Sequence, residues 1–326
     1  MHILTVRKKL IYKYFVNFCI QKSRTVAQMN TAKLLDLVQS CIPPLNNSKH
    51  KGQAGRIGIV GGSLEYTGAP YFAGISALKV GADLVHIFCA SQAATVIKSY
   101  SPELIVHPLL DRENAITEIS PWLDRLHAIV IGPGLGRESK IFLTVSKLIP
   151  IINEKRIPLV IDADGLFLIT ENLNLIKDFT SPVILTPNKI EFERLCCKIN
   201  LTAGVNQLGS CLTILRKGET DEVFSPTASV QWKSNVGGSG RRCGGQGDVL
   251  SGALATFLNW ILSNKDNVSI DEEVDINLLA SSLACYAASA LVRKCNERAF
   301  QIKGRSMLAS DMIESIHDAF TELYEK

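Results

Sequence analysis

The residues best suited to chemistry lie between positions 237 and 252, where the sequence reads GGSGRRCGGQGDVLSG. The glycines precede a helical-looking run, and glycine lets successive backbone NH groups converge without a Cβ in the way. A helix start adds unpaired NH groups and the positive end of the helix dipole. This combination favours an anion such as phosphate, beside which Asp248 could take part in catalysis. The alternative is that Asp248 only caps the helix.

Further polar residues follow the apolar runs that we predict to be strands. Asp162 and Asp164 follow PLVI, where they could orient magnesium or a hydroxyl, or else cap the next helix. Asn188 and Glu191 share one face of a helix start, which suits a hydrated metal or phosphate oxygens but equally suits a capping box. Lys217 begins a Lys-Gly turn after CLTIL. In chain order, the sequence thus has strand-end acids, an Asn-x-x-Glu helix start, a Lys-Gly turn and the glycine-rich helix start with Asp248. Together these four signals suggest a kinase-like site for phosphoryl transfer.

A second glycine cluster, IGPGLGR, follows the apolar run HAIVI and would let a ligand approach the backbone at Gly132, Gly134 and Gly136. It does not fit the dinucleotide fingerprint GxGxxG, and the chain contains no GxxxxGK followed by Ser or Thr. The sequence therefore supports neither a Rossmann dehydrogenase nor a P-loop enzyme.

The elements that must position these residues alternate between strand and helix. The run RIGIVGG precedes a small-residue helix, and the pattern recurs through LVHIFCA, HAIVIG, PLVIDADG and PVILTPN. This alternation predicts an α/β fold with a mainly parallel central sheet and helices on both faces, with ligands at the carboxyl ends of the strands. We expect antiparallel edge strands from CLTIL to WKSN, then a helix through LLASSLACYAASALVRK and a single C-terminal helix. We predict one domain over residues 29–326.

Composition narrows the function classes. The 326 residues carry a net charge of only +4, with no basic face interleaved with aromatic residues, so nucleic acid is not an expected partner. The nine cysteines are odd in number and lack a CxxC pair, which indicates reduced thiols and an intracellular protein. The six histidines lack metal-ligand spacing, so no structural zinc site is expected.

Residues 1–28 are basic and contain no acid, as in an organelle presequence. The apolar run within them is too short for a membrane span and is interrupted by Lys13, so no membrane association is expected. A second start at Met29 would leave an amphipathic helix ended by Pro43 and Pro44, and a cytosolic product. Mitochondrial and cytosolic forms are both expected possibilities, depending on whether Met1 or Met29 is used.

From about Leu45 to the end, the sequence resembles the ATP-dependent NAD(P)H-hydrate dehydratase family of the ribokinase-like superfamily. The resemblance is clearest in EYTGAPYF, IGPGLGR, VIDADGL, LTPNKIEFERL and GGSGRRCGGQGD. Gly240 departs from the family, which usually has proline there. The epimerase domain fused in some relatives has no counterpart here, so a separate epimerase is an expected partner in the same pathway.

The resemblance implies ATP-dependent repair of the S epimer of hydrated NADH or NADPH, with Mg²⁺ accompanying ATP. Asp248 would be the catalytic base, and Gly245, Gln246 and Gly247 would stabilise the transferred phosphoryl group. The residues implied to bind the hydrate are Gly134, Gly136, Asn188, Lys189, Ile190, Glu191, Phe192, Glu193, Arg194 and Asp248. Those implied to bind ATP are Lys217, Gly218, Glu219, Thr220, Asp221, Gly238, Ser239, Gly240, Arg241, Arg242, Cys243, Gly244, Gly245, Gln246 and Gly247.

Other possibilities stay open at the level of the sequence. Asn188 and Glu191 could organise Mg²⁺ through water. A small-molecule kinase of the same fold is the alternative function, and an inactive nucleotide-binding protein that kept the fold is another. Preference between NADH and NADPH hydrates is left open by the sequence, and a homo-oligomer is possible.

Overall fold

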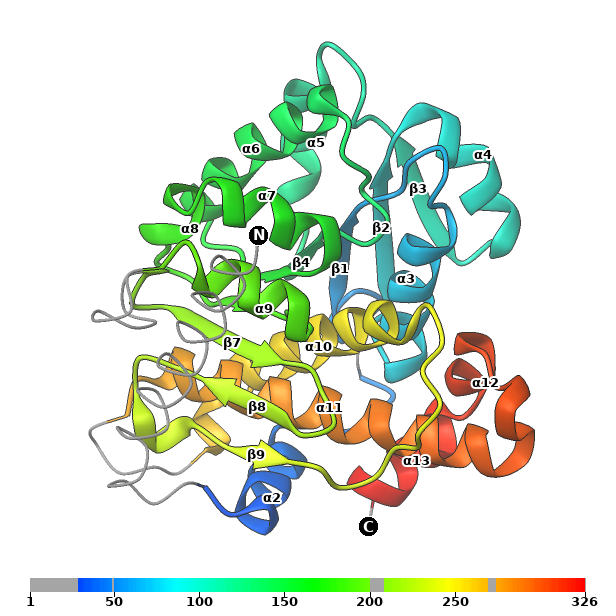
Figure 1. Ribbon diagram of the computed structural model, residues 1–326, viewed down its shortest axis with the longest axis vertical. Coiled ribbons are helices and arrows are strands. Elements are labelled where there is room, and N and C mark those ends of the chain that lie inside the picture. The colour runs from blue at the N-terminus through cyan, green and yellow to red at the C-terminus, as the bar shows by residue number, and fades with distance from the viewer. Residues whose placement is uncertain (1–28, 49, 200–207, 269–273, 326) are drawn as a thin grey trace, which may run out of the picture.

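The computed structural model describes residues 29–48, 50–199, 208–268 and 274–325, so the expected presequence, residues 1–28, lies outside the described residues. Within these ranges, nine strands form one sheet in the order β3-β2-β1-β4-β5-β6-β7-β8-β9 (Figure 1). The strands are β1 (Arg56–Val60), β2 (Leu84–Cys89), β3 (Leu104–Pro108), β4 (Ala128–Ile131), β5 (Leu159–Ile161), β6 (Val183–Leu185), β7 (Leu212–Arg216), β8 (Asp221–Phe224) and β9 (Lys233–Ser234).

The first seven strands are parallel, and their composition explains why. β4, β5 and β6 are short, wholly apolar runs in which every residue is buried. Strands buried on both faces occur where helices cover both sides of a parallel sheet. The expected α/β architecture is therefore confirmed.

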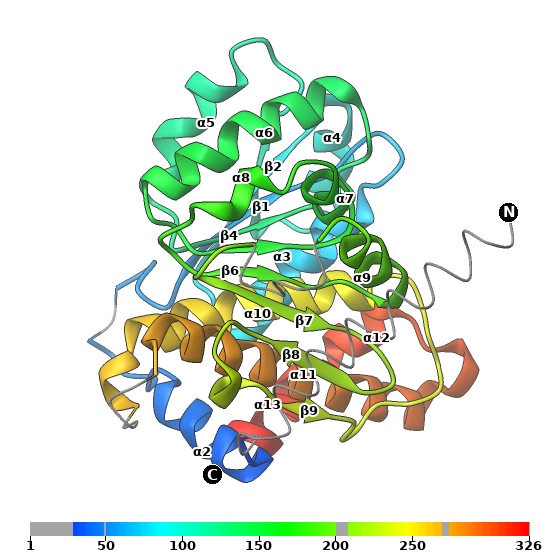
Figure 2. The same cartoon turned by 60° about the vertical axis from the view of Figure 1, so that its left-hand side comes forward.

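Helices cover the two faces of the sheet in separate groups (Figure 2). One face carries α2 (Thr31–Cys41), α3 (Gly68–Val80), α4 (Ser91–Tyr100), α10 (Gln246–Ser263), α11 (Ile276–Lys303), α12 (Ala309–Glu314) and α13 (Ile316–Tyr324). The other carries α5 (Ala115–Leu123), α6 (Ser139–Glu154), α7 (Ala163–Glu171), α8 (Asn174–Lys177) and α9 (Lys189–Cys196). Each group forms its own buried apolar cluster with one face of the sheet.

Helix α10 packs very closely on α3. A Cβ added to Gly252 would lie 1.9 Å from the backbone oxygen of Ala73, so only glycine fits at this contact. At the far end of the helix, the Trp260 indole donates a hydrogen bond to the Ala54 carbonyl (2.6 Å). The helix that begins at the glycine-rich stretch is thus fixed along its length.

Helix α11 and the following 3-10 turn, Ile276–Ser306, are long and apolar enough to cross a membrane by length and composition. However, 72% of the most apolar window is buried inside the protein, as in the core helix of a globular domain. This burial accounts for the apolar run LLASSLACYAASALV without a partner subunit.

Two expectations about the elements are wrong. β7 pairs with β6 in parallel, and the chain reverses only afterwards, so that β8 and β9 alone are antiparallel. β7 is an apolar strand buried almost throughout, so it continues the parallel core. The C-terminal helix is divided at Ser315, whose hydroxyl donates to the Asp311 carbonyl (2.9 Å) and whose NH bonds Met312. A serine hydroxyl that bonds the preceding turn competes with the helical pattern.

Candidate active site

The strand-end acids separate into two roles. Asp162 follows β5, and its Oδ1 accepts hydrogen bonds from the Thr186 hydroxyl (2.8 Å) and the Lys217 ammonium (2.7 Å). Thr186 follows β6 and Lys217 follows β7, so three neighbouring strands bring these groups to one edge of the sheet. Asp162 occupies the N-cap position of α7 but makes no side-chain cap bond, so the capping alternative is wrong for this residue.

Asp164 points to a different segment. Its carboxylate accepts from the Gly136 NH (3.1 Å) and from Arg137 Nε (3.0 Å), which fixes the loop that follows β4. Between the two acids, Ala163 has a φ of 46°, a left-handed conformation that residues with a Cβ rarely adopt. This turn directs the Asp162 carboxylate toward Lys217 and the Asp164 carboxylate toward the loop that follows β4.

A cavity of about 480 Å³ adjoins this loop. Its lining includes Ser63, Glu65, Gly136, Arg137 and Lys140. The Ser63 hydroxyl is buried and has no hydrogen-bond partner among the described residues.

Helix α10 begins as the sequence predicts. Its N-cap, Gly245, has a φ of 91°, and a Cβ there would lie 2.7 Å from Ala309 Cβ and 2.9 Å from Phe72 Cδ2. A Cβ on Gly134 would lie 3.2 Å from Ala69 Cβ, one turn earlier on α3 than Phe72. The glycine loop after β4 and the start of α10 therefore both close on the first turns of α3.

Asp248 lies in the first turn of α10, half-buried, and no hydrogen bond joins its carboxylate to any other described residue. A role limited to capping is therefore wrong. Burial, and next the negative charge of Asp162, raise the Asp248 pKa to about 8, while Lys217 acts in the opposite direction. A carboxylate with a pKa near neutrality suits a catalytic acid or base.

Burial and neighbouring charges also shift the pKa values of Lys217 and Glu191. Burial opposes the charge of Lys217, but Asp162, Glu191 and Asp248 outweigh it and the Lys217 pKa is raised. Burial also raises the Glu191 pKa, against the opposing effect of Lys217. The site thus holds a cation among three carboxylates beside a helix N-terminus.

A second cavity, of about 530 Å³, lies between the glycine-rich stretch, the Lys-Gly turn and α11. The predicted ATP residues that line it are Lys217, Gly218, Asp221, Gly238, Arg242, Cys243, Gln246 and Gly247, joined by Asn188 and Lys189 from the predicted hydrate set. The predictions missed four residues of α11: Ser289, Val292, Arg293 and Asn296. The available signal was a cluster of polar residues in an otherwise apolar helix.

Three predicted residues have well-defined structural roles. Asn188 and Glu191 form the capping box of α9, with the Asn188 NH donating to Glu191 (2.8 Å). The Asp221 carboxylate accepts from the Gly218 NH (2.9 Å) and from the Ser289 hydroxyl (2.6 Å), so it braces the Lys-Gly turn against α11. These contacts give Asn188, Glu191 and Asp221 structural roles, and they do not by themselves show that any of the three binds a ligand.

One member of the predicted hydrate set lies in the core. The Phe192 side chain is fully buried and stacks on Phe224, with ring centroids 5.3 Å apart, so direct contact with a substrate is wrong for this residue. By contrast, Ile190 is 68% exposed on the same helix. Helical periodicity separates them: residues two apart face different sides.

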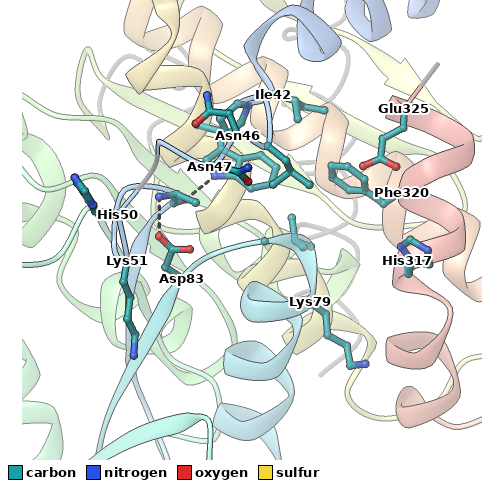
Figure 3. A pocket seen from close by; sticks show the side chains of 16 residues that line it. Ile42, Asn46, Asn47, His50, Lys51, Lys79, Asp83, His317, Phe320 and Glu325 are labelled. Atoms are coloured by element: carbon teal, nitrogen blue, oxygen red, sulfur yellow. Dashed lines mark hydrogen bonds between the residues drawn. The ribbon is translucent and has the colours of Figure 1, made fainter.

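A further cavity, of about 470 Å³, lies at the opposite, amino edge of the sheet (Figure 3). Its lining includes Trp260, Phe320 and Asp83, and Asp83 accepts from the Gly52 and Ala54 NH groups (2.7 and 2.9 Å). It contains none of the predicted site residues. Because ligands of such sheets bind outside the carboxyl ends of the strands, we do not place the active site here.

Comparisons with known proteins identify the family of this chain. The model of the NAD(P)H-hydrate dehydratase family matches residues 57–318. The chain belongs to this family. An ATP-dependent (S)-NAD(P)H-hydrate dehydratase of Aedes aegypti is 54% identical over 310 residues, which cover 94% of this chain and 90% of the relative. The human protein with the same name is 47% identical over 322 residues, covering 94% and 89%.

Solved structures bear out the ribokinase-like fold of this NAD(P)H-hydrate dehydratase family member. A Streptococcus mutans protein matches with a TM-score of 0.68 at 19% identity, covering 92% of this chain and all of the other. The ADP/ATP-dependent NAD(P)H-hydrate dehydratase of Bacillus subtilis, co-crystallised with ATP and Mg²⁺, matches with a TM-score of 0.63 at 20% identity, covering 89% and 97%. At these identities the similarity establishes the fold.

Proposed function

We propose that this chain is an ATP-dependent dehydratase, a carbon-oxygen lyase, that converts the S epimer of hydrated NADH and NADPH back to NAD(P)H, releasing ADP and phosphate. The observation that carries the proposal is the Asp248 carboxylate in the first turn of α10, which has no hydrogen bond to another described residue and lies within electrostatic reach of the Lys217 ammonium. A base, a cation and a glycine-rich helix start are the parts that phosphoryl transfer to a hydroxyl requires.

The chemistry follows from the leaving group. In the hydrate, water has added across a ring double bond, and hydroxide leaves poorly. Asp248 takes the proton of this hydroxyl while the hydroxyl oxygen attacks the γ-phosphorus of ATP, and ADP leaves. The ring nitrogen lone pair then helps to expel phosphate, which leaves an iminium cation, and loss of a proton from the neighbouring ring carbon to water restores the double bond. Gly245, Gln246 and Gly247 supply backbone NH groups to the transferred phosphoryl group, together with the Lys217 ammonium.

Mg²⁺ fits this site as part of the nucleotide. No cluster of three or more His, Cys, Asp or Glu side chains that could hold a metal occurs among the described residues. Mg²⁺ characteristically binds through one or two carboxylates, water and substrate phosphates, so a protein cage is not required. We propose that Glu191 and Asn188 would hold Mg²⁺ through water, and that the ion would neutralise negative charge on the phosphates of ATP.

The decisive experiment combines ATP with hydrated NADH. Recovery of the reduced-nicotinamide absorbance, with one ADP released per molecule repaired, supports the dehydratase. A stable phosphorylated product would instead support a small-molecule kinase, and no hydrate-dependent ATP consumption would support an inactive nucleotide-binding protein. Asp248→Asn should still bind ATP but lose roughly 10²- to 10⁴-fold in turnover, the usual contribution of a general base. Near-normal turnover in this variant would contradict the role of Asp248.

Partner and compartment are further proposals. A separate epimerase is proposed to supply the S epimer, since this chain is expected to act on one epimer. Mitochondrial and cytosolic forms are proposed from Met1 and Met29, on the basic composition of residues 1–28. Fusing residues 1–28 to a fluorescent protein tests the mitochondrial form, and diffuse fluorescence would contradict it. Light scattering tests the proposed homo-oligomer.

A further inference from the structure

Asp162 is a buried carboxylate to which the reaction above assigns no step. Its side chain is 3% exposed, and Thr186 and Lys217 both donate to the same oxygen, Oδ1. A buried ion pair adds little net stability, because removing two charges from water offsets much of their attraction. Stability alone is therefore a poor reason for this arrangement.

The ammonium held by Asp162 lies against the start of α10. A Cβ built on Gly247 would lie 3.2 Å from Lys217 Nζ and 3.6 Å from Asp162 Oδ2. The Lys217 backbone is also fixed, because its NH donates to the Pro187 carbonyl (2.9 Å). The pair consequently lies directly beside the NH groups that face the phosphoryl group.

Lys217 has other negative partners within electrostatic reach. Glu191, on α9, and Asp248, on α10, both favour its charged form. A lysine has a flexible four-carbon stem, so without a fixed partner its ammonium would be free to pair with either carboxylate. Pairing with Asp248 would neutralise the base and remove the cation from the anion-binding position at once.

We propose that Asp162, held by Thr186, is a positioning residue that keeps the Lys217 ammonium at the start of α10 and away from Asp248. The inference rests on the proposed function. It predicts that Asp162 acts through Lys217 and contributes nothing to turnover independently.

A double-mutant cycle tests this prediction. Asp162→Asn, Lys217→Met and the double variant are compared by kcat/KM in the coupled ATP and hydrate assay. Loss of one preorganised donor costs roughly 10²-fold or more, and residues that act as a unit lose activity together rather than multiplicatively. We expect each single variant to lose roughly 10²-fold, and the double variant to stay within about 3-fold of Lys217→Met. Multiplied losses in the double variant would overturn the inference.

The pH profile adds a readout that a purely structural role would not move. Asp162 raises and Lys217 lowers the pKa of Asp248. The rise of kcat/KM with pH should therefore move to lower pH in Asp162→Asn and to higher pH in Lys217→Met. Unchanged profiles in both active variants would overturn the inference.

A milder variant covers the case in which Asp162→Asn fails to fold. Thr186→Val removes one hydrogen bond to Asp162 and keeps its charge, so kcat should fall roughly 3- to 10-fold. The matched control is Thr213→Val on β7, since the Thr213 hydroxyl is buried and has no partner among the described residues. Equal kcat values in these two variants would contradict the positioning role.

Failure of the inference differs from failure of the proposed function. If the unmodified chain does not couple ATP consumption to hydrate repair, the proposed function is wrong. If the unmodified chain repairs the hydrate and folded Asp162→Asn retains its turnover, only the positioning role is wrong.

Discussion

Asn296 on α11 accepts hydrogen bonds through one side-chain oxygen from both the NH (2.6 Å) and the hydroxyl (2.7 Å) of Ser239. Its amide nitrogen also donates to the Arg241 carbonyl (3.4 Å). Asn296 is buried, so these contacts tie the exposed glycine-rich loop to a helix of the core. The conformation of the glycine-rich loop thus depends on Asn296, a residue far away in the sequence.

Asn296→Leu should raise the KM for ATP roughly 10-fold, because loss of these bonds leaves the loop free to adopt other conformations in the unbound protein. Ser239→Ala removes only the hydroxyl bond and should cause a smaller increase. Initial rates at varied ATP concentration measure both effects. An unchanged KM in Asn296→Leu, with folding verified by circular dichroism, would contradict this role.

The pKa of Asp248 should make stability depend on pH. Between its ordinary pKa of about 4 and its folded value of about 8, the folded state binds more protons at this site than the unfolded state. Stability should therefore decrease as pH rises through this window, and Asp248→Asn should remove that decrease. Urea unfolding at pH 5, 6.5 and 8 measures the difference, with the exposed Asp36→Asn as control. A constant difference between Asp248→Asn and the unmodified chain would refute the assignment.

The same pKa predicts how activity responds to pH. If Asp248 must be deprotonated to accept the hydroxyl proton, kcat/KM for the hydrate should increase with pH, with a midpoint near 8 in the enzyme that has not yet bound the hydrate. Initial rates at saturating ATP and limiting hydrate, from pH 6 to 9.5, measure it. A flat profile across this range would show that a different group takes the proton.

Two adjacent glycines offer a matched test of the anion-binding turn. Gly245 has a left-handed φ and no room for a Cβ, whereas a Cβ on Gly244 would meet nothing within 4 Å. Gly245→Ala should lower kcat/KM by roughly 10²-fold, because the NH groups would be displaced from the phosphoryl position. Gly244→Ala should stay within about 3-fold of the unmodified chain. Similar losses in both variants would argue against a conformational requirement specific to Gly245.

Gly240 provides a prediction of increased stability. A Cβ there has open space, its φ lies outside the left-handed region, and its NH makes no hydrogen bond to another described residue. Gly240→Pro should stabilise the protein by about 0.4–1 kcal/mol by restricting the unfolded chain, and should lower the KM for ATP. Gly240→Ala is the control and should have the smaller effect. A higher KM in Gly240→Pro would indicate that the loop needs the freedom of glycine.

Local patterns in the sequence were sufficient to predict most of the fold. The buried runs β4, β5 and β6 and the glycines after β1 and β4 predicted the parallel sheet and its ligand-binding edge. The direction of β7 was not predictable in this way, because the pairing of a strand depends on its neighbour in space. The edge strand β3 was not predicted either, because only its first three residues, Leu104 to Val106, are apolar and His107 and Pro108 follow.

Local sequence was sufficient to single out Asp248 and Lys217 as candidate site residues, because their chemistry follows from the residues around them. Contacts within the site were missed where they join distant segments, as between Ser239 and Asn296 or Asp162 and Thr186. The mistaken inclusion of Phe192 has a related cause: a continuous segment was assigned to the ligand although a helix turns alternate residues inward.

The close contact between Gly252 and Ala73 limits how this enzyme can move. Helix α10 cannot slide or rotate against α3 without a collision of backbones, and Trp260 anchors its other end. We therefore expect the first turn of α10, which carries Asp248, to keep its position during turnover. We therefore expect any rearrangement around a bound ligand in the glycine-rich loop before α10, where Gly240, Arg242 and Gly244 are exposed.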